Sequence, residues 1–150
     1  LPKVLLDALF ARALTVAINE SGSGGRFGSL LLSEPAAQGV VLGITASAAA
    51  ESASAADLAA TAQARFGSDV GVGIAATLRP SAQGLFEGHI DVALSGAYSA
   101  VESFPIRAAF AEIQRRAALN AADVLRRALI GEPEARSGDR PEAIFEPTPG

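Results

Sequence analysis

The feature that most constrains the fold of this chain is a glycine-rich turn between an apolar run and a stretch with helical spacing. The turn reads ESGSGG and extends from Glu20 to Gly25. Leu14, Val16 and Ile18 precede it and predict a buried strand, and the apolar residues after it recur at helical intervals. A strand, a glycine turn and a helix in this order predict an α/β fold. They also predict backbone N–H groups pointing outward at the start of the helix.

Such N–H groups can hold a phosphate or a carboxylate, so we expect any small-molecule site to lie at this turn. The predicted ligand-binding residues of the turn are Gly22, Ser23, Gly24 and Gly25. We expect the last three amides to face a cavity, and capping of them by the protein's own side chains would argue against a ligand. Arg79 follows a predicted strand and is a further candidate for pairing with a phosphate, the alternative being a solvated side chain.

Ser21 and Glu20 are the candidate catalytic residues. Ser21 would act as a nucleophile, with Ser23 as another hydroxyl near the substrate, and Glu20 would act as a general base or bind a ribose. A serine nucleophile needs a nearby base, and the single histidine, His89, lies far along the chain on a predicted strand. The alternatives are structural, because a serine hydroxyl can cap a helix and a carboxylate can bind the backbone of a turn.

Composition excludes several classes of site and of partner. The chain has 150 residues, which predicts one domain, and it contains no cysteine and one histidine, so we expect no metal site. The net charge of −4 argues against nucleic acid as a partner. We expect no membrane span, because no apolar run is long enough, and no signal peptide, since the first residues read as a mature helix. The cytoplasm is the expected location, and no cofactor is predicted.

The whole pattern predicts a three-layer α/β/α sandwich with a mixed sheet, because the last strands follow one another through a short turn. The predicted helices cover residues 2–13, a segment after the glycine turn that stops near Pro35, 52–66 and 107–130, and the later strands cover 39–46, 69–76, 88–96 and 98–104. The intervening LRPSAQGLFEG is expected to be a loop, and Pro105 to end the last strand. The domain is predicted to span 1–131, and 132–150 to form a proline-rich acidic tail whose apolar element Ala143–Phe145 docks on this subunit or a neighbour.

Several segments, read in order, resemble the C-terminal domain of the CinA competence-damage family, which includes nicotinamide mononucleotide deamidases. The glycine turn matches the family's ESCTGG, and similar segments continue over about residues 3–130. They include VLGIT at 41–45, FGSDVGVGI at 66–74, the strand from Gly88 to Leu94, and Phe104–Pro105 followed by Arg107. The resemblance implies the family's α/β/α fold, self-association into a homo-oligomer, and a pyridine nucleotide as the ligand.

The departures from the family pattern bear on chemistry. The cysteine of the family's turn is Gly22 here, and the serine-containing GSS that follows the family's proline is replaced by residues 36–38, Ala-Ala-Gln. The tract that carries the family's tyrosine and lysine reads ITASAAAES, and no lysine follows Lys3. We therefore predict that amidohydrolase chemistry of the family type is lost.

Three functions follow from this reading. The first is a divergent CinA-type domain that binds a small anionic ligand, such as nicotinamide mononucleotide, at the ESGSGG turn with degraded catalysis. The second is an active nicotinamide-nucleotide amidohydrolase that uses Ser21 and Glu20. The third is a structural domain that serves assembly.

Overall fold

The computed structural model describes residues 1–48 and 53–131, and the predicted tail therefore lies outside the described residues. Within these ranges, four helices and five strands follow one another in the predicted order, with two short 3-10 turns, η1 and η2, between them. Their bounds are α1 Pro2–Ala11, β1 Val16–Ser21, α2 Arg26–Leu32, η1 Pro35–Ala37, β2 Val41–Ser47, α3 Ala55–Phe66, β3 Val70–Pro80, η2 Ala82–Gly84, β4 Phe86–Gly96, β5 Ala100–Ala108 and α4 Phe110–Gly131.

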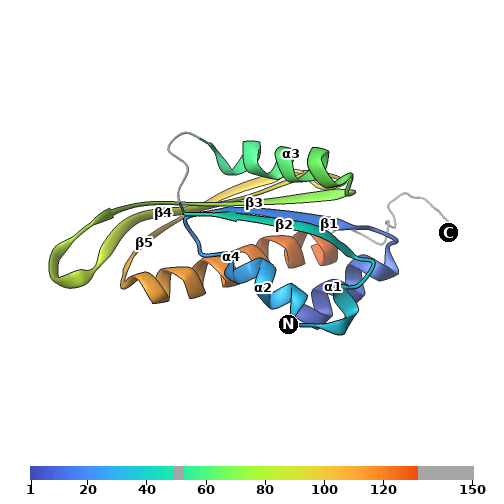
Figure 1. Ribbon diagram of the computed structural model, residues 1–150, viewed down its shortest axis with the longest axis horizontal. Coiled ribbons are helices and arrows are strands. Elements are labelled where there is room, and N and C mark those ends of the chain that lie inside the picture. The colour runs from blue at the N-terminus through green and yellow to red at the C-terminus, as the bar shows by residue number, and fades with distance from the viewer. Residues whose placement is uncertain (49–52, 132–150) are drawn as a thin grey trace.

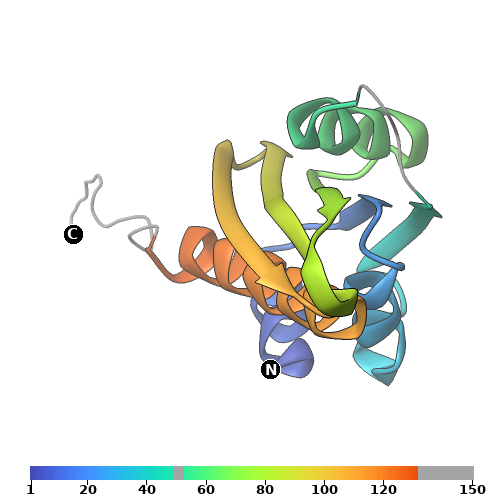
Figure 2. The ribbon, with the colours of Figure 1, turned by 90° about the vertical axis from the view of Figure 1, so that its left-hand side faces the viewer.

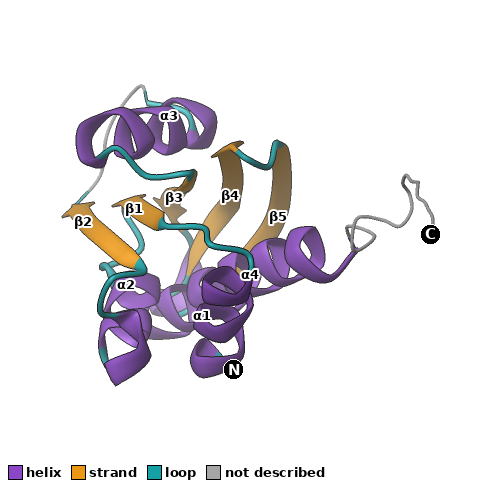
Figure 3. Cartoon of the chain, turned by 90° about the vertical axis from the view of Figure 1, so that its right-hand side faces the viewer, coloured by secondary structure: helices purple, strands orange, loops and turns teal. Residues whose placement is uncertain are grey.

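The five strands form one mixed sheet with the order β2-β1-β3-β4-β5. Strand β1 pairs in parallel with β2 and β3, whereas β3–β4 and β4–β5 are antiparallel. Helices cover both faces. Helix α3 lies alone on one face, and α1, α2 and α4 lie on the other (Figures 1, 2 and 3). The predicted three-layer sandwich with a mixed sheet is therefore confirmed.

The two faces of the sheet are packed differently. The α1–α2–α4 face holds the main core, in which large aliphatic side chains such as Ile18, Leu125 and Leu129 are fully buried. The α3 face is built from small residues, so that the helix backbone approaches the sheet closely. A Cβ atom added to Gly71 would collide with the carbonyl oxygen of Ala59, and one added to Gly73 with that of Ala55.

The prediction that LRPSAQGLFEG, after the third strand, is a loop is wrong. Strand β3 continues to Pro80 and β4 begins at Phe86, so the two strands form a long hairpin that extends past the ends of β1 and β2 (Figure 1). The reason is packing: Leu78 and Phe86 join the main core, and the ring of Phe86 lies 5.8 Å from that of Phe110. A glycine- and proline-containing sequence reads as a loop when this distant partner is unknown.

Pro105 does not end the last strand. Strand β5 continues through Pro105 to Ala108, and α4 consequently begins at Phe110 instead of residue 107. Strand β5 is an edge strand, and a proline is tolerated there because its missing N–H leaves no ladder hydrogen bond unmade. The glycine turn is also shorter than predicted. Glu20 and Ser21 belong to β1, so the turn itself starts at Gly22.

Three further features of the described residues concern membranes, metals and the charges of α4. Over 1–48 and 53–131, no helix has the length and apolar character needed to cross a bilayer. Within the same ranges, no three His, Asp or Glu side chains come together as metal ligands. The arginines of α4 form ion pairs. Glu112 pairs with Arg115 and Arg116, and Asp123 pairs with Arg126 and Arg127.

Candidate functional site

The glycine turn leaves the carboxyl end of β1 between its two parallel neighbours. Gly22, Gly24 and Gly25 have positive φ angles of 78°, 77° and 71°, a conformation that glycine adopts at little cost. The amide of Gly22 donates to the carbonyl of Ser47 at the end of β2. On the other side, a Cβ atom on Gly22 would lie 2.8 Å from the carbonyl oxygen of Ala76 in β3. The turn is therefore hydrogen-bonded to β2 and lies close against β3.

Glu20 lies on β1, two residues before the turn, and is buried, with 1% of its surface exposed. Its carboxylate accepts a hydrogen bond from the Ser23 hydroxyl at 2.7 Å and another from the Gly28 amide at 2.7 Å. The Phe27 amide also donates to it. The N-cap residue of α2, Gly25, has no side chain that could cap the helix. Glu20 therefore caps α2 from the adjacent strand, which is the structural alternative that the sequence left open.

Burial raises the pKa of Glu20 above its ordinary value of 4.5. The hydrogen bonds from Ser23, Gly28 and Phe27 act in the opposite direction, because they favour the carboxylate, but the loss of solvent dominates. Glu20 is therefore a carboxyl group that is costly to ionise and is held in place by three donors.

The raised pKa predicts a pH-dependent effect on stability. A group whose pKa is higher in the folded state contributes most below its unfolded pKa, and this contribution falls as the pH rises through the folded-state value. Glutamine keeps the shape of Glu20 but cannot ionise. We expect the unfolding free energy of Glu20→Gln, measured by urea denaturation relative to the unsubstituted chain, to increase as the pH rises from about 4 to about 7. A difference that stayed constant or decreased over this range would contradict the assignment.

The two serines of the turn region are both buried. Ser21 is 3% exposed and Ser23 is fully buried, and the hydroxyl of Ser23 is donated to Glu20. His89 is remote from them. Its Nδ1 lies 3.1 Å from Oδ1 of Asp91 on β4. Asp91 pairs with Ala75 of β3, and Ala75 in turn pairs with Ser21 of β1. Two strand spacings, about 10 Å, thus separate Ser21 from Asp91. The structure does not bring a histidine to either serine.

Two amides of the turn remain available, those of Gly24, which is exposed, and of Gly25, which is half-buried. Within the part of the chain that the structure describes, the N–H groups of Ser23, Gly24 and Gly25 have no hydrogen-bond acceptor. The capping by Glu20 occurs at Phe27 and Gly28 and uses none of these amides, but the N–H of Ser23 is buried and does not face a ligand. The start of α2 can therefore still contact an anion through N–H groups that are not hydrogen-bonded, although Glu20 accepts from the N–H groups that follow them.

Two residues near these amides were not predicted from the sequence. Arg26, the first residue of α2, is exposed and makes no ion pair with any described residue. Gln114 of α4 is close to the turn, since a Cβ atom on Gly24 would lie 2.5 Å from its Nε2. Arg26 follows the turn directly and was detectable by its position. Gln114 is far away in sequence, and only the packing of α4 brings it there.

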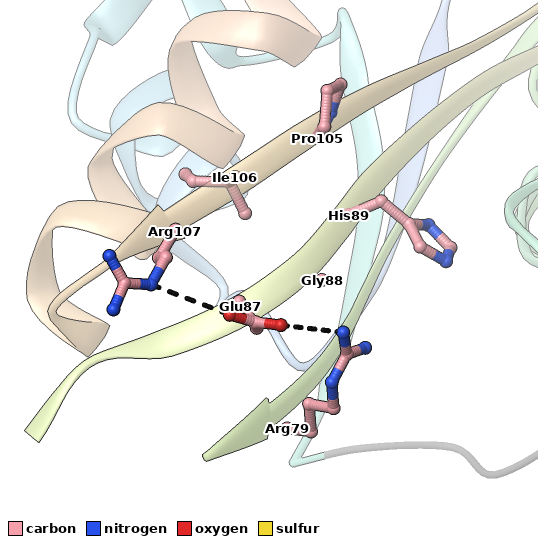
Figure 4. Close-up of a pocket in the computed structure, with 7 residues that line it drawn as sticks. All are labelled: Arg79, Glu87, Gly88, His89, Pro105, Ile106 and Arg107. Atoms are coloured by element: carbon pink, nitrogen blue, oxygen red, sulfur yellow. Dashed lines mark hydrogen bonds and ion pairs between the residues drawn. The ribbon is translucent and has the colours of Figure 1, made fainter. Parts of the chain in front are cut away.

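Arg79, the other predicted ligand contact, lies in a different environment. It is three residues beyond Ala76 on β3, about 10 Å along the strand, and shares the α3 face with Gly71 and Gly73. Its Nη2 donates to Oε2 of Glu87 at 2.6 Å, and Arg107 approaches the same carboxylate at 3.5 Å. These residues and His89 line an open depression of about 520 Å³ on the hairpin (Figure 4).

The arrangement of the sheet and the helices has counterparts among solved structures. A competence-damaged protein (CinA) superfamily protein from Klebsiella pneumoniae matches with a TM-score of 0.71 and 13% identity, over 87% of this chain and 96% of its own. The chain has a CinA-like fold. The competence/damage-inducible protein CihA from Agrobacterium tumefaciens gives 0.66 and 17%, over 86% and 93% of the two chains. A CinA superfamily protein from Escherichia coli gives 0.63 and 18%, over 86% and 84%.

The CinA resemblance seen in the sequence is thus confirmed for the fold. The sequence matches no protein-family model and no curated protein. At 13% to 18% identity, the likeness to these solved structures concerns architecture and leaves the activity to be argued from this chain's own residues.

The structure also shows where the chain's lysine and its tyrosine lie. Lys3, the sole lysine, is on α1 and pairs with exposed Asp7. Tyr98, the sole tyrosine, follows β4, whose last residue, Gly96, pairs with Val70 at the amino end of β3. The glycine turn lies at the opposite, carboxyl end of the parallel strands. Tyr98 therefore lies towards the end of the sheet opposite the turn, and Lys3 is engaged with Asp7 on α1.

Proposed function

We propose that this chain is a binding domain for a small anionic ligand, of which a pyridine nucleotide such as nicotinamide mononucleotide is the favoured example. The ligand would bind at the turn Gly22–Gly25, and the chain would not hydrolyse it. The observation that carries this proposal is the pair of accessible turn amides, those of Gly24 and Gly25, which have no acceptor among the described residues and stand beside the exposed Arg26. Backbone N–H groups and an arginine are the donors that phosphate groups favour.

The position of the turn in the sheet supports the same conclusion. The strands β2, β1 and β3 are neighbours in that order, and β1 and β3 are parallel. In α/β sheets with this order, ligands bind outside the carboxyl ends of the strands, between the first and third. Gly22 lies at this point, at the end of β1 and against Ala76 of β3.

The alternative function, hydrolysis of the nucleotide amide, draws on the short hydrogen bond between Ser23 and Glu20. A serine within 2.7 Å of a carboxylate is the geometry of a nucleophile and its base. However, Ser23 is fully buried and Ser21 nearly so, whereas a nucleophile must contact the substrate. The same carboxylate also caps α2, which gives it a structural role without catalysis. We therefore favour binding over turnover.

A charge reversal tests the location of the site. We expect Arg26→Glu to weaken the binding of nicotinamide mononucleotide by at least about tenfold, since a charge-assisted pair is replaced by repulsion. The measurement is calorimetric titration of the purified chain. The matched control is Arg65→Glu on α3, where the arginine lies over the ring of Phe66 and away from the turn. Equal affinities for the two variants would place the ligand elsewhere, and loss of affinity in Arg79→Ala would place it at the hairpin.

A further inference from the structure

An apolar groove lies on the side of the molecule opposite α3, where α1, α2 and α4 meet. Its volume is about 100 Å³, and every residue that lines it is apolar. Leu5, Phe27 and Leu31 are buried and form its floor. Leu30 of α2 and Leu119 of α4 form its rim and remain 38% and 44% exposed. The groove is therefore large enough for about one apolar side chain.

The rim of the groove carries an excess of positive charge on α4. Arg115 is four residues before Leu119 and hence one turn away on the same side of the helix. It shares the single carboxylate of Glu112 with Arg116, the two distances being 2.6 and 2.8 Å. Two guanidinium groups and one carboxylate leave this part of the rim with a net charge of +1. An occupant with acidic residues beside its apolar side chain would fit both features.

The segment of the chain that follows α4 has this composition. Residues 132–150 contain one run of three apolar residues, Ala143-Ile144-Phe145, and it stands between Glu142 and Glu146. We propose that this run docks in the groove of its own subunit, with Phe145 or Ile144 as the apolar anchor and the two glutamates towards the arginines of α4. The occupant is thus a segment of this chain, and this inference is independent of the ligand proposed for the turn.

The length of the chain permits this docking. Helix α4 ends at Gly131, and Ala122 at the groove is nine residues earlier, which corresponds to about 14 Å along the helix. The eleven residues 132–142 can extend over about 36 Å. The segment can therefore fold back over α4 to the groove, and its attachment raises its local concentration there.

The absence of cysteine from the sequence allows a direct crosslinking test. The full chain with Leu119→Cys and Ala143→Cys carries one thiol at the rim and one in the segment. The control pairs Ala143→Cys with Ser103→Cys, which is exposed on β5 and lies next to Glu102, the partner of Arg127 near the end of α4. We expect the intrachain disulfide to form at least about tenfold faster with Leu119→Cys than with Ser103→Cys. Non-reducing electrophoresis and mass spectrometry measure both rates.

A third substitution tests the anchor itself. Adding Phe145→Ser and Ile144→Ser to the Leu119→Cys pair is expected to reduce its rate to that of the control, because the apolar anchor is removed while the thiols and the chain length are kept. Equal rates for the two original pairs would overturn the proposal. Disulfides that form mainly between two chains, and increasingly so with protein concentration, would also overturn it, since the groove would then receive the segment of a second copy.

Discussion

Replacing Glu20 by alanine is expected to lower the unfolding free energy by about 3–5 kcal/mol. The substitution removes a fully buried side chain and leaves three donors inside the protein without an acceptor: the Ser23 hydroxyl and the amides of Phe27 and Gly28. Each unsatisfied buried donor costs about 1–3 kcal/mol, and the cavity adds to this cost. Urea denaturation at neutral pH, followed by circular dichroism, measures the change.

Asp7→Ala is the matched control, since it also removes a carboxylate that makes a 2.7 Å contact. The partner of Asp7 is Lys3, four residues earlier on an exposed helix face, so we expect little or no change in the unfolding free energy. If Glu20→Ala were as mild as this control, Glu20 would not be the cap of α2, and its carboxylate would be free for another role.

Adding one methyl group at Gly73 is the second large effect that we expect. A Cβ atom there would collide with the carbonyl oxygen of Ala55 and lie 2.6 Å from the amide nitrogen of Ala59. Both belong to the backbone of α3, which cannot rotate away as a side chain does. The helix must therefore move off the sheet, and we expect Gly73→Ala to lower the unfolding free energy by about 2–3 kcal/mol.

The matched control is the same substitution at Gly131, where a Cβ atom meets no described residue within 4 Å. Gly131 is the last residue of α4, and alanine has the higher helix propensity, so the change should be neutral or slightly stabilising. Thermal and urea denaturation of both variants give the comparison. Unchanged stability of Gly73→Ala would mean that α3 packs less closely on the sheet than the structure shows.

The order of elements could be predicted from the sequence because each strand is an apolar run between turn residues. What could not be predicted depends on contacts between distant segments. The hairpin from Leu78 to Phe86 is held by the main core and by Phe110, which lies 24 residues after Phe86. Pro105 is compatible with a strand only because β5 lies at the edge of the sheet, and the sequence does not reveal which strand is at the edge.

Some features of the candidate site could likewise be predicted from the sequence, and others could not. The glycine turn and its location at a strand end were visible in the sequence, because positive φ angles call for glycine. The inward direction of Glu20 was also detectable, since it alternates with Val16 and Ile18 and therefore shares their buried face. The contact of Gln114 with the turn was not, because it depends on how α4 crosses the sheet.

The most direct test of the central claim is calorimetric titration of the full chain with nicotinamide mononucleotide, with ammonia release followed in the same sample. We predict saturable binding and no ammonia above the buffer control, since the amides of Gly24 and Gly25 and the side chain of Arg26 are accessible while both serines are buried. The absence of binding at millimolar ligand would contradict the proposed ligand class. Ammonia release that is abolished by Ser21→Ala or Ser23→Ala would show instead that the chain is an active amidohydrolase.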